Sequence, residues 1–480
     1  MSSATTLLKQ FTDADIDWML DANEERHVTA GENVIVKGEP VDAMYIVLEG
    51  VLAVEGSDAA RPIDVVGPGD VVGEMSFVEQ VTPTQSVAAM EASLLLVVPH
   101  SALHQRADDE PAFAARLYRA LAVLLSQRLR RASNHRSVRG AAQFADERER
   151  TVSEQVAAGV EQLKELLQTA QQQGLKHDGT VPAELAGQVE TMLVELYRAM
   201  HAAIGDDAPG TEQFKEQMGI RIQRELVPYI LLTKNAARTL TKPRGYAGDY
   251  LTIESMYADQ PGGVAPLGPL LDDCIMGFPP SLAVRNRRGL LAEEIVAVVE
   301  ACDGQTARIM SLACGPAREI FDVFETLPEA SRLKATLIDF DLQALAYVAE
   351  RRDGLGLQRS ITLTPENLIH LAIGRKTIAV DEQDLVYSIG LIDYFPDELV
   401  VKLMSLIHSL LRPGGKAILG NFHPSNTCKA FMDHVLEWRL VHRSEADMDR
   451  LYRASAFGRD CTTIRFEEQG INLFAECVKA

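Results

Sequence analysis

The sequence predicts a multidomain chain in which an antiparallel β-barrel, an α-helical connector and an α/β domain follow one another. Short strands separated by glycine turns fill residues 28–100, a helical period follows, and the C-terminal half alternates apolar strands with helices. We place the three parts at residues 1–135, 136–240 and 241–480. A chain of 480 residues is long enough for two or three domains, each with its own hydrophobic core.

The composition is that of a globular protein and excludes several classes of function. The formal net charge of −21 repels phosphate backbones, so nucleic acid is a poor candidate partner. The chain has no long apolar run and no basic, apolar leader, which predicts no transmembrane segment, no signal peptide and a cytoplasmic protein. The cysteines lack C-x-x-C spacing and nearby histidine pairs, so we expect reduced thiols and no metal site. They are Cys274, Cys302, Cys314, Cys428, Cys461 and Cys477.

The first part has closely spaced turn signals, which predict a small antiparallel barrel or jelly roll. The spacing of Gly50, of Gly69-Asp70 and of Gly73-Glu74 resembles that of the cyclic nucleotide-binding domain. The resemblance implies a regulatory ligand site. There Gly73 would open a short helix over the cyclic phosphate, and Glu74 would bind the ribose 2′-hydroxyl.

One position departs from this pattern. The family places an arginine on the phosphate downstream of the Gly-Glu pair, where this chain has Thr84 or Gln85. Without that cation a buried cyclic phosphate loses charge-assisted hydrogen bonds of roughly 1.5–3 kcal/mol each. We therefore expect cyclic nucleotide to bind weakly or not at all, and the barrel to be a structural, dimerising or differently liganded module.

Helical periodicity continues over residues 154–173, 183–203 and 214–232. Pro182 suits the first turn of the middle helix, where its missing N–H costs nothing. The apolar stripe of this helix is more typical of a bundle core than of a ligand groove. No helix-turn-helix follows the barrel, which argues against a transcription regulator. We expect these helices to connect the domains and, with the barrel, to form a homodimer.

In the α/β domain, an apolar strand at 308–312 ends in a turn of small residues and leads directly into a helix. Such a turn lets a ligand lie against bare backbone at the carboxyl edge of a sheet. A second apolar strand, 335–339, ends on Asp339, a carboxylate suited to bind two ribose hydroxyls. A dinucleotide site would need G-x-G-x-x-G, of which only Gly315 is present. The pattern resembles instead the S-adenosyl-L-methionine (SAM) site of class I methyltransferases, whose ligand carries no phosphate.

Later segments extend this resemblance. Residues 384–395 are typical of a fourth strand that runs into a loop, and 411–422 of a helix end, a Pro-Gly-Gly turn and a fifth strand. A terminal hairpin over 461–478 resembles the reversed last strand of class I methyltransferases. The resemblance implies SAM as the cofactor and a Rossmann-like sheet. The cofactor-binding residues that we expect within the sheet domain are Ala313, Cys314, Gly315, Asp339, Asn367 and Gly390.

Two runs before the first strand narrow the resemblance. They are Arg-Gly-Tyr-Ala-Gly-Asp-Tyr at 244–250 and Ala-Val-Arg-Asn-Arg-Arg at 283–288. With the first-strand turn and the Asp-Tyr-Phe loop, they resemble bacterial SAM-dependent methyltransferases associated with synthesis of 3-hydroxypalmitic acid methyl ester. The preceding segment commonly folds over the site as a lid. The resemblance implies that Arg244 and Tyr246 bind the cofactor and that Arg285 and Arg288 bind an acidic lipid substrate.

The acceptor side of the site is expected after the fourth and fifth strands. His423 could orient the acceptor or act as a base, and Tyr394 is a second catalytic candidate. The apolar segment 430–457, with Trp438, could surround an aliphatic tail. The function we expect is carboxyl O-methylation of a 3-hydroxy fatty acid. A methyltransferase for another small acceptor, and a SAM-binding signalling regulator without catalysis, remain as alternatives.

Overall fold

The computed structural model divides the chain into two compact units. The described residues of 1–140, together with 242–246, form the barrel unit, and those of 141–241 and 247–480 form the α/β unit. The residues that the structure describes are 11–12, 14–15, 18–19, 24–55, 64–67, 70–79, 81–121, 147–327 and 332–480.

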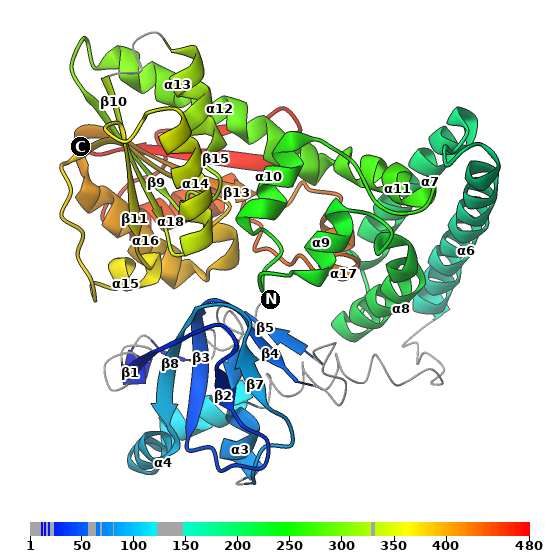
Figure 1. The fold of residues 1–480 in the computed structure, drawn as a ribbon, viewed down its shortest axis with the longest axis horizontal. Helices are drawn as coiled ribbons and strands as arrows, with labels where there is room; N and C mark the ends of the chain where they lie inside the picture. Colours follow the sequence, from blue (N-terminus) through cyan, green and yellow to red (C-terminus); the bar gives the residue numbers. More distant parts are fainter. Residues whose placement is uncertain are drawn as a thin grey trace. The chain divides into compact units, whose positions relative to one another are not determined.

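The barrel unit is built from two four-stranded antiparallel sheets (Figure 1). Their strand orders are β1-β8-β3-β6 and β2-β7-β4-β5. Side chains of both sheets meet in one hydrophobic core that includes Val28, Val47, Leu52 and Leu95. The predicted antiparallel barrel is therefore confirmed. Its elements are β1 Glu24–Val28, β2 Asn33–Ile35, β3 Ala43–Glu49, β4 Leu52–Val54, β5 Asp64–Val66, β6 Val71–Val72, α3 Glu74–Glu79, β7 Val87–Ala89, β8 Ser93–Pro99 and α4 His100–Asp109.

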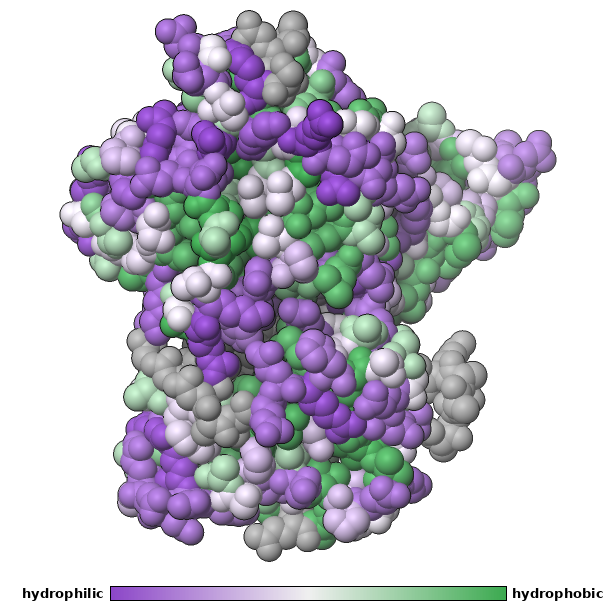
Figure 2. Space-filling view, turned by 60° about the vertical axis from the view of Figure 1, so that its left-hand side comes forward, coloured by the Kyte–Doolittle hydropathy of each residue, from purple (hydrophilic) through white to green (hydrophobic). Residues whose placement is uncertain are grey.

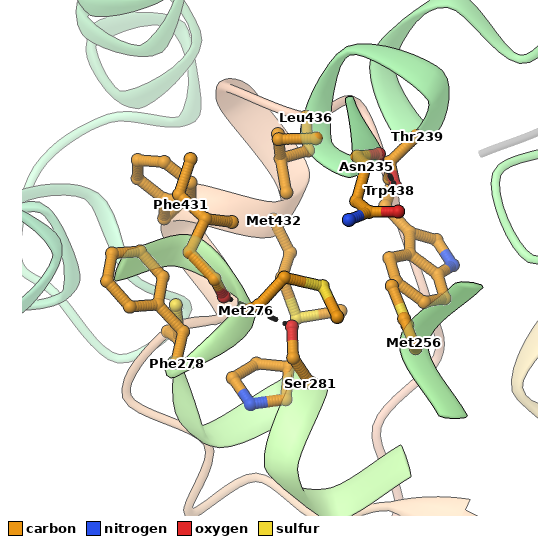
Figure 3. Close-up of a pocket in the computed structure, with 14 residues that line it drawn as sticks. Asn235, Thr239, Met256, Met276, Phe278, Ser281, Phe431, Met432, Leu436 and Trp438 are labelled. Atoms are coloured by element: carbon orange, nitrogen blue, oxygen red, sulfur yellow. Dashed lines mark hydrogen bonds between the residues drawn. The ribbon is translucent and has the colours of Figure 1, made fainter. Parts of the chain in front are cut away.

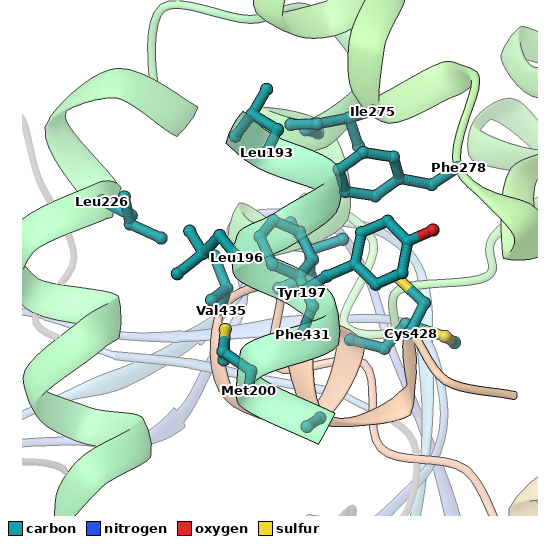
Figure 4. Packing of buried hydrophobic residues seen from close by; sticks show 14 of the residues in the cluster. Leu193, Leu196, Tyr197, Met200, Leu226, Ile275, Phe278, Cys428, Phe431 and Val435 are labelled. Atoms are coloured by element: carbon teal, nitrogen blue, oxygen red, sulfur yellow. The ribbon is translucent and has the colours of Figure 1, made fainter. Parts of the chain in front are cut away.

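Three long helices open the α/β unit: α6 (Glu147–Lys176), α7 (Ala183–Ile204) and α8 (Glu212–Ile230). The apolar stripe of α7 is buried, and Pro182 precedes the helix as its N-cap residue. Figure 4 shows α7 side chains packed against Phe278 and against Phe431 of α17 (Lys429–His434). The stripe is thus a bundle core, as predicted, and this core extends into later parts of the chain.

Four further helices lead from the bundle to the sheet: α9 (Asn235–Thr241), α10 (Tyr250–Ala258), α11 (Leu267–Met276) and α12 (Pro279–Ala301). Asp249 caps α10 by accepting the backbone N–H groups of Leu251 and Thr252. The first half of α12 packs into the helical cluster, and its second half packs on the sheet. This helix therefore joins the two parts of the unit.

The sheet of the α/β unit has the strand order β11-β10-β9-β12-β13-β15-β14. Neighbours from β11 to β13 are parallel, whereas β15 is antiparallel to both β13 and β14. The chain order reverses between β9 and β12, which is the switch point where open α/β sheets bind ligands. The predicted sheet with a reversed terminal strand is confirmed. The strands are β9 Ala307–Leu312, β10 Leu333–Asp339, β11 Ile361–Pro365, β12 Gln383–Ile389, β13 Leu411–Phe422, β14 Thr463–Phe466 and β15 Asn472–Val478.

Helices cover both faces of this sheet (Figure 1). Leu291, Ile320 and Leu345 bring α12, α13 and α14 into the hydrophobic cluster on one face. Leu403 and Met448 bring α16 and α18 into the cluster on the other. The remaining helices are α13 Arg318–Thr326, α14 Leu342–Gly354, α15 Leu368–Ala372, α16 Asp397–Leu410 and α18 Glu445–Ala454.

The structure differs from the sequence prediction at the start of the fifth strand. Helix α16 ends at Leu410 and β13 begins at once at Leu411, without a separate Pro-Gly-Gly turn. These residues form a register irregularity opposite Gln383–Leu385, and Gly414 has a φ of 77°. Glycine adopts this backbone conformation without a steric penalty, so the Pro-Gly-Gly segment forms an irregular part of the strand rather than a turn before it.

Hydrophilic and hydrophobic residues are interspersed on the face seen in the space-filling view (Figure 2). The exposed large hydrophobic side chains come from separate elements, among them Met75, Leu175 and Leu342. Single apolar residues of this kind are ordinary on a folded surface. Among the helices whose residues the structure describes, none is long and apolar enough to cross a membrane.

Candidate ligand site at the carboxyl edge of the sheet

The turn between β9 and α13 has an unusual backbone. Ala313, Gly315 and Ala317 have positive φ angles of 56°, 51° and 48°. A non-glycine residue in this region costs about 1–2 kcal/mol, so the two alanines hold backbone strain. A Cβ added at Gly315 would meet no atom within 4 Å, which shows open space beside the turn. Burial raises the pKa of the Cys314 thiol, so this cysteine is a neutral wall rather than a nucleophile.

Asp339, the last residue of β10, lies against this turn. Its carboxylate accepts the backbone N–H groups of Gly315 and Asp341, each at 2.9 Å. The residue is 5% exposed, and burial raises the pKa of its carboxyl to about 6 although both amides favour the charged form. A carboxylate has about four lone-pair sites, so Asp339 can accept further hydrogen bonds. The structure thus brings together Gly315 and Asp339, and their role in cofactor binding stays a prediction.

Asn367 and Gly390 follow the neighbouring strands β11 and β12. The side-chain oxygen of Asn367 accepts the backbone N–H groups of Ile369 (2.9 Å) and His370 (3.4 Å) and so caps α15. Gly390 has a φ of 74°. A Cβ added at Gly390 would stand 3.1 Å from the Arg287 guanidinium, so this glycine leaves room for the arginine.

Arg287 belongs to this edge and was not among the predicted site residues. It is 5% exposed, and its Nε is buried without a hydrogen-bond partner. The helical period could have indicated its position, because Val284 and Leu291 precede and follow it by three and four residues on the buried face of α12. The resemblance instead assigned a binding role to Arg285 and Arg288 of the same basic segment.

Arg285 and Arg288, which the resemblance assigned to substrate binding, both have acidic partners. Arg285 donates to Asp259 and to the carbonyl of Met276, the latter at 2.8 Å. Arg288 donates to both carboxylate oxygens of Asp322, at 2.5 and 2.6 Å. A substrate would have to compete with these ion pairs, and the predicted role of both arginines remains open to test.

Tyr394 lies in a short 3-10 helix, η2 (Ile392–Tyr394), after β12. Its hydroxyl oxygen accepts a hydrogen bond from Nε1 of Trp438 at 2.9 Å. Burial raises the pKa of the Tyr394 hydroxyl, which keeps it neutral at pH 7. A Cβ at Gly248 would stand 2.6 Å from the Tyr394 hydroxyl oxygen, so only glycine fits there. The structure therefore joins two predicted residues, Tyr394 and Trp438, although their catalytic and substrate-binding roles remain predictions.

His423 follows β13 directly. Its Nδ1 accepts the backbone N–H of Ser425 (3.1 Å), and its Nε2 lies 3.0 Å from a carboxylate oxygen of Glu445. Because Nδ1 accepts a hydrogen bond, the neutral ring carries its proton on Nε2, facing Glu445. Both ring nitrogens are thus already engaged, and the predicted catalytic role of His423 is still a prediction.

An apolar pocket lies between helices α9 to α12 and the segment after β13 (Figure 3). Phe278 and Phe431 line one side, and Met256 and Trp438 line the other. Its free volume of about 20 Å³ is room for roughly one water molecule. Methionine side chains adapt their shape readily. The pocket is therefore a small, deformable cavity that would have to widen to hold an aliphatic chain.

In the barrel unit, Gly73 and Glu74 open the short helix α3, as the sequence predicted. Gly73 has a φ of 87°, and a Cβ there would stand 2.6 Å from the Ala43 carbonyl oxygen. Glu74 is buried, whereas Thr84 is exposed. Whether the barrel binds cyclic nucleotide remains a prediction.

Arg244 and Tyr246, which the resemblance assigned to the cofactor, belong to the barrel unit. Arg244 forms an ion pair with Glu91 at 3.3 Å. Arg244 thus has an acidic partner within the barrel unit. The role of Arg244 and Tyr246 in cofactor binding stays a prediction.

Comparison with known protein families supplies an identity for the α/β unit. Residues 231–476, more than half of the chain, match the family model described as "Putative methyltransferase". The chain belongs to this methyltransferase family. Residues 25–110 match the model of the cyclic nucleotide-binding domain, so the methyltransferase carries this domain at its N-terminal side. No curated protein sequence matches the chain.

Solved structures resemble parts of the methyltransferase. A possible exported protein from Bordetella parapertussis is 20% identical, with 61% of this chain and 96% of that chain covered, at a TM-score of 0.43. A cyclic nucleotide-binding protein from Geobacter metallireducens is 19% identical over 26% of this chain and 94% of that one, at a TM-score of 0.24. Magnesium protoporphyrin IX methyltransferase from Synechocystis, crystallised with S-adenosylhomocysteine, is 12% identical over 42% of this chain and 87% of that one, at a TM-score of 0.33.

Proposed function

We propose that the α/β unit binds SAM and transfers its methyl group to a small acidic acceptor. The observation that carries the proposal is the contact between the Gly315 turn after β9 and the Asp339 carboxylate at the end of β10, at the carboxyl edge of a methyltransferase-family sheet. A nucleoside fits this edge, because a ribose offers two hydroxyl donors and the turn offers bare backbone.

The residues of this edge fit SAM in three respects. Gly315 borders open space, so a ligand can approach the backbone closely. The Asp339 carboxylate has acceptor capacity left for ribose hydroxyls. The Asn367 side chain is occupied in capping α15, so we expect the backbone of its loop, rather than its amide, to line the adenine.

We further propose that the acceptor is the carboxylate of a 3-hydroxy fatty acid, as the resemblance implies. A carboxylate oxygen would form the new bond to the methyl carbon while the carbon–sulfur bond breaks and sulfur keeps the electron pair. The products are a methyl ester and a neutral thioether. A carboxyl pKa of roughly 4–5 leaves the acceptor ionised at pH 7, so no base is required. The protein then has to align the oxygen with the methyl group and exclude water.

The apolar pocket supports an acceptor with an aliphatic part. Phe431, Met432, Leu436 and Trp438 of the predicted apolar segment line it. Trp438 also donates to Tyr394, so the pocket wall is linked to the loop after β12. Once widened, the pocket would suit the tail of an amphiphile whose polar head lies at the sheet edge.

Two measurements test the proposal. Calorimetry with S-adenosylhomocysteine should show binding to the purified chain, and the absence of heat would contradict SAM binding. Mass spectrometry should then detect methyl esters formed from SAM and a chain-length series of 3-hydroxy acids. With a carboxylate acceptor the rate should be nearly flat between about pH 6 and 9, because the nucleophile is already ionised.

A methyltransferase for another small acceptor is the second candidate. A phenol or amine acceptor must lose a proton, so its rate should rise with pH and should depend on a base such as His423. If the chain binds S-adenosylhomocysteine but methylates no acid of any length, this candidate replaces the ester. If no acceptor is methylated at all, the non-catalytic SAM-binding regulator remains.

Three other expectations belong to the proposal. The cysteines of the chain are all free thiols, which suits a cytoplasmic location. A homodimer through the barrel and the helices after it, and domain boundaries near residues 135 and 240, stay predictions. Cross-linking with mass analysis would test the dimer, and limited proteolysis would test the boundaries.

A further inference from the structure

Arg287 is a buried cation that forms no ion pair with a carboxylate of the described residues. Among the residues that the structure describes, no ion pair involves Arg287, and its Nε has no hydrogen-bond partner. A buried guanidinium left unpaired is costly, and most buried polar groups in folded proteins are satisfied. The site therefore has capacity for an anion that the protein itself does not supply.

The other arginines near this edge differ from Arg287 in this respect. Arg285 pairs with Asp259, Arg288 with Asp322, and Arg318 forms a two-pronged ion pair with Glu254. Only Arg287 of these four is both nine-tenths buried and without such a partner. Its unpaired state is thus a specific feature of the site rather than a property of the basic run.

The groups that face Arg287 come from several elements. The Tyr257 hydroxyl of α10 lies close to it, and Gly390 after β12 makes room for its guanidinium. Glu319 of α13 and Asp393 of η2 are close enough to feel its charge, yet both are already hydrogen-bonded, to the Tyr387 hydroxyl and to the Phe422 N–H. Tyr394 also feels its charge.

Both acids have raised carboxyl pKa values because they are buried, and that of Asp393 is about 6. Asp393 is still mostly ionised at pH 7, but no ion pair joins either acid to Arg287 in the part of the chain that the structure describes. Glu319 comes from the helix after β9, and Asp393 and Tyr394 come from the loop after β12. The guanidinium therefore lies near the switch point of the sheet, between β9 and β12. An anionic ligand at this position would meet both the turn and the loop that bears Tyr394.

We propose that Arg287 binds a ligand carboxylate at the edge between β9 and β12. The inference rests on the proposed function, in which two carboxylates are available: that of the methionine part of SAM and that of the acceptor. Arginine matches a carboxylate with two parallel N–H donors, which gives orientation as well as affinity. Arg287 is accordingly a positioning residue for whichever carboxylate it holds.

The test compares ligands that differ by one carboxylate. S-adenosylhomocysteine and 5′-methylthioadenosine, which lacks the amino-acid part, are titrated into wild type, Arg287→Gln and Arg287→Lys. The protein saturated with S-adenosylhomocysteine is then titrated with 3-hydroxydodecanoate and with its methyl ester. Arg308→Gln is the matched control, because Arg308 lies at the opposite end of β9 in an exposed ion pair with Asp381.

If Arg287 holds the cofactor carboxylate, Arg287→Gln should lose about 10- to 100-fold in affinity for S-adenosylhomocysteine and none for methylthioadenosine. If it holds the acceptor carboxylate, the same loss should appear for the acid and not for the ester. Arg287→Lys should recover part of either loss, and Arg308→Gln should match wild type. Thermal unfolding of each variant checks that it folds.

Wild-type protein alone can also contradict the proposal. If it binds methylthioadenosine as tightly as S-adenosylhomocysteine, and the acid no better than its ester, Arg287 holds neither carboxylate. Unchanged affinities in Arg287→Gln would lead to the same conclusion. A wild-type protein that does not bind S-adenosylhomocysteine would instead remove the proposed function itself.

Discussion

Each unit has a glycine shortly before a helix and close to a carboxylate, and the surroundings of the two glycines differ. In the barrel unit, Gly73 is required by packing, because a Cβ there would stand 2.6 Å from a backbone carbonyl. In the α/β unit, Gly315 borders open space. The barrel has Thr84 where its family places a cation, whereas the α/β unit has a buried, unpaired Arg287. The two turns therefore stand in different surroundings, and we expect the two units to differ in ligand binding.

Removing the carboxylate of the α/β unit should change its affinity for the cofactor more than any other substitution proposed for the two turns. Asp339→Asn should lower affinity for S-adenosylhomocysteine by roughly 100-fold or more, because hydrogen bonds to a charged group contribute about 1.5–3 kcal/mol each. Calorimetry measures the change. Asp353→Asn, at an exposed carboxylate near the end of α14, is the control and should bind as wild type does. An unchanged affinity in Asp339→Asn would mean that the turn does not hold the ribose.

The pH dependence of stability should show the cost of burying this carboxylate. The pKa of Asp339 is raised from 3.8 to about 6, so folding is favoured by the protonated form. This contribution is fully present below pH 3.8 and is lost as pH rises through 6, which amounts to about 2 kcal/mol between pH 4 and 7.5. Urea unfolding of wild type and Asp339→Asn should therefore converge at low pH and diverge at high pH, with the variant more stable at pH 7.5. Parallel curves would show that Asp339 titrates normally.

A cation supplied at the position where the barrel lacks one should raise the affinity of the barrel for a cyclic nucleotide. Thr84→Arg should raise affinity for cyclic AMP by about tenfold, the effect of one charge-assisted hydrogen bond. Thr82→Arg adds the same charge at another exposed position and should have little effect. Fluorescence competition with a labelled nucleotide measures both. A submicromolar dissociation constant for wild type would show that another residue already replaces the arginine.

The smallest effect concerns strain in the turn of the α/β unit. Ala313→Gly should raise the free energy of unfolding by about 1 kcal/mol, because glycine tolerates the positive φ. Ala317→Gly relieves similar strain but removes a fully buried methyl group worth about 0.8 kcal/mol, so it should be nearly neutral. Chemical denaturation distinguishes the pair. Equal destabilisation by both changes would contradict strain at this turn.

The elements around the turn could be predicted from the sequence because their signals are local. The apolar run before Ala313, the small residues of the turn and the carboxylate that ends the next strand follow one another in the chain. The hairpin over 461–478 also has local signals, whereas the reversal of its last strand is implied by the resemblance to class I methyltransferases. The structure of the Pro-Gly-Gly segment was not predicted correctly. It continues strand β13 through an irregularity in the register with β12, which the turn motif does not indicate.

The side-chain partners could not be predicted as well. The helical period of α12 indicates that Arg287 is buried, but it does not show that Asp259 pairs with Arg285 and Asp322 with Arg288. Similarly, the loop position of His423 did not reveal that Ser425 and Glu445 engage both ring nitrogens. These outcomes depend on residues far apart in sequence, which periodicity does not report.

The core shared by the helices and the pocket has a practical consequence for dissecting the protein. Phe278 packs on Tyr197 of α7 and on Phe431, with ring centroids 4.9 and 5.4 Å apart, and both phenylalanines also line the pocket. A fragment that began at residue 231, where the family match begins, would strip one side from these rings. Expression of the methyltransferase half should therefore start before α6, since the first three helices share one hydrophobic core with the side chains that line the cavity.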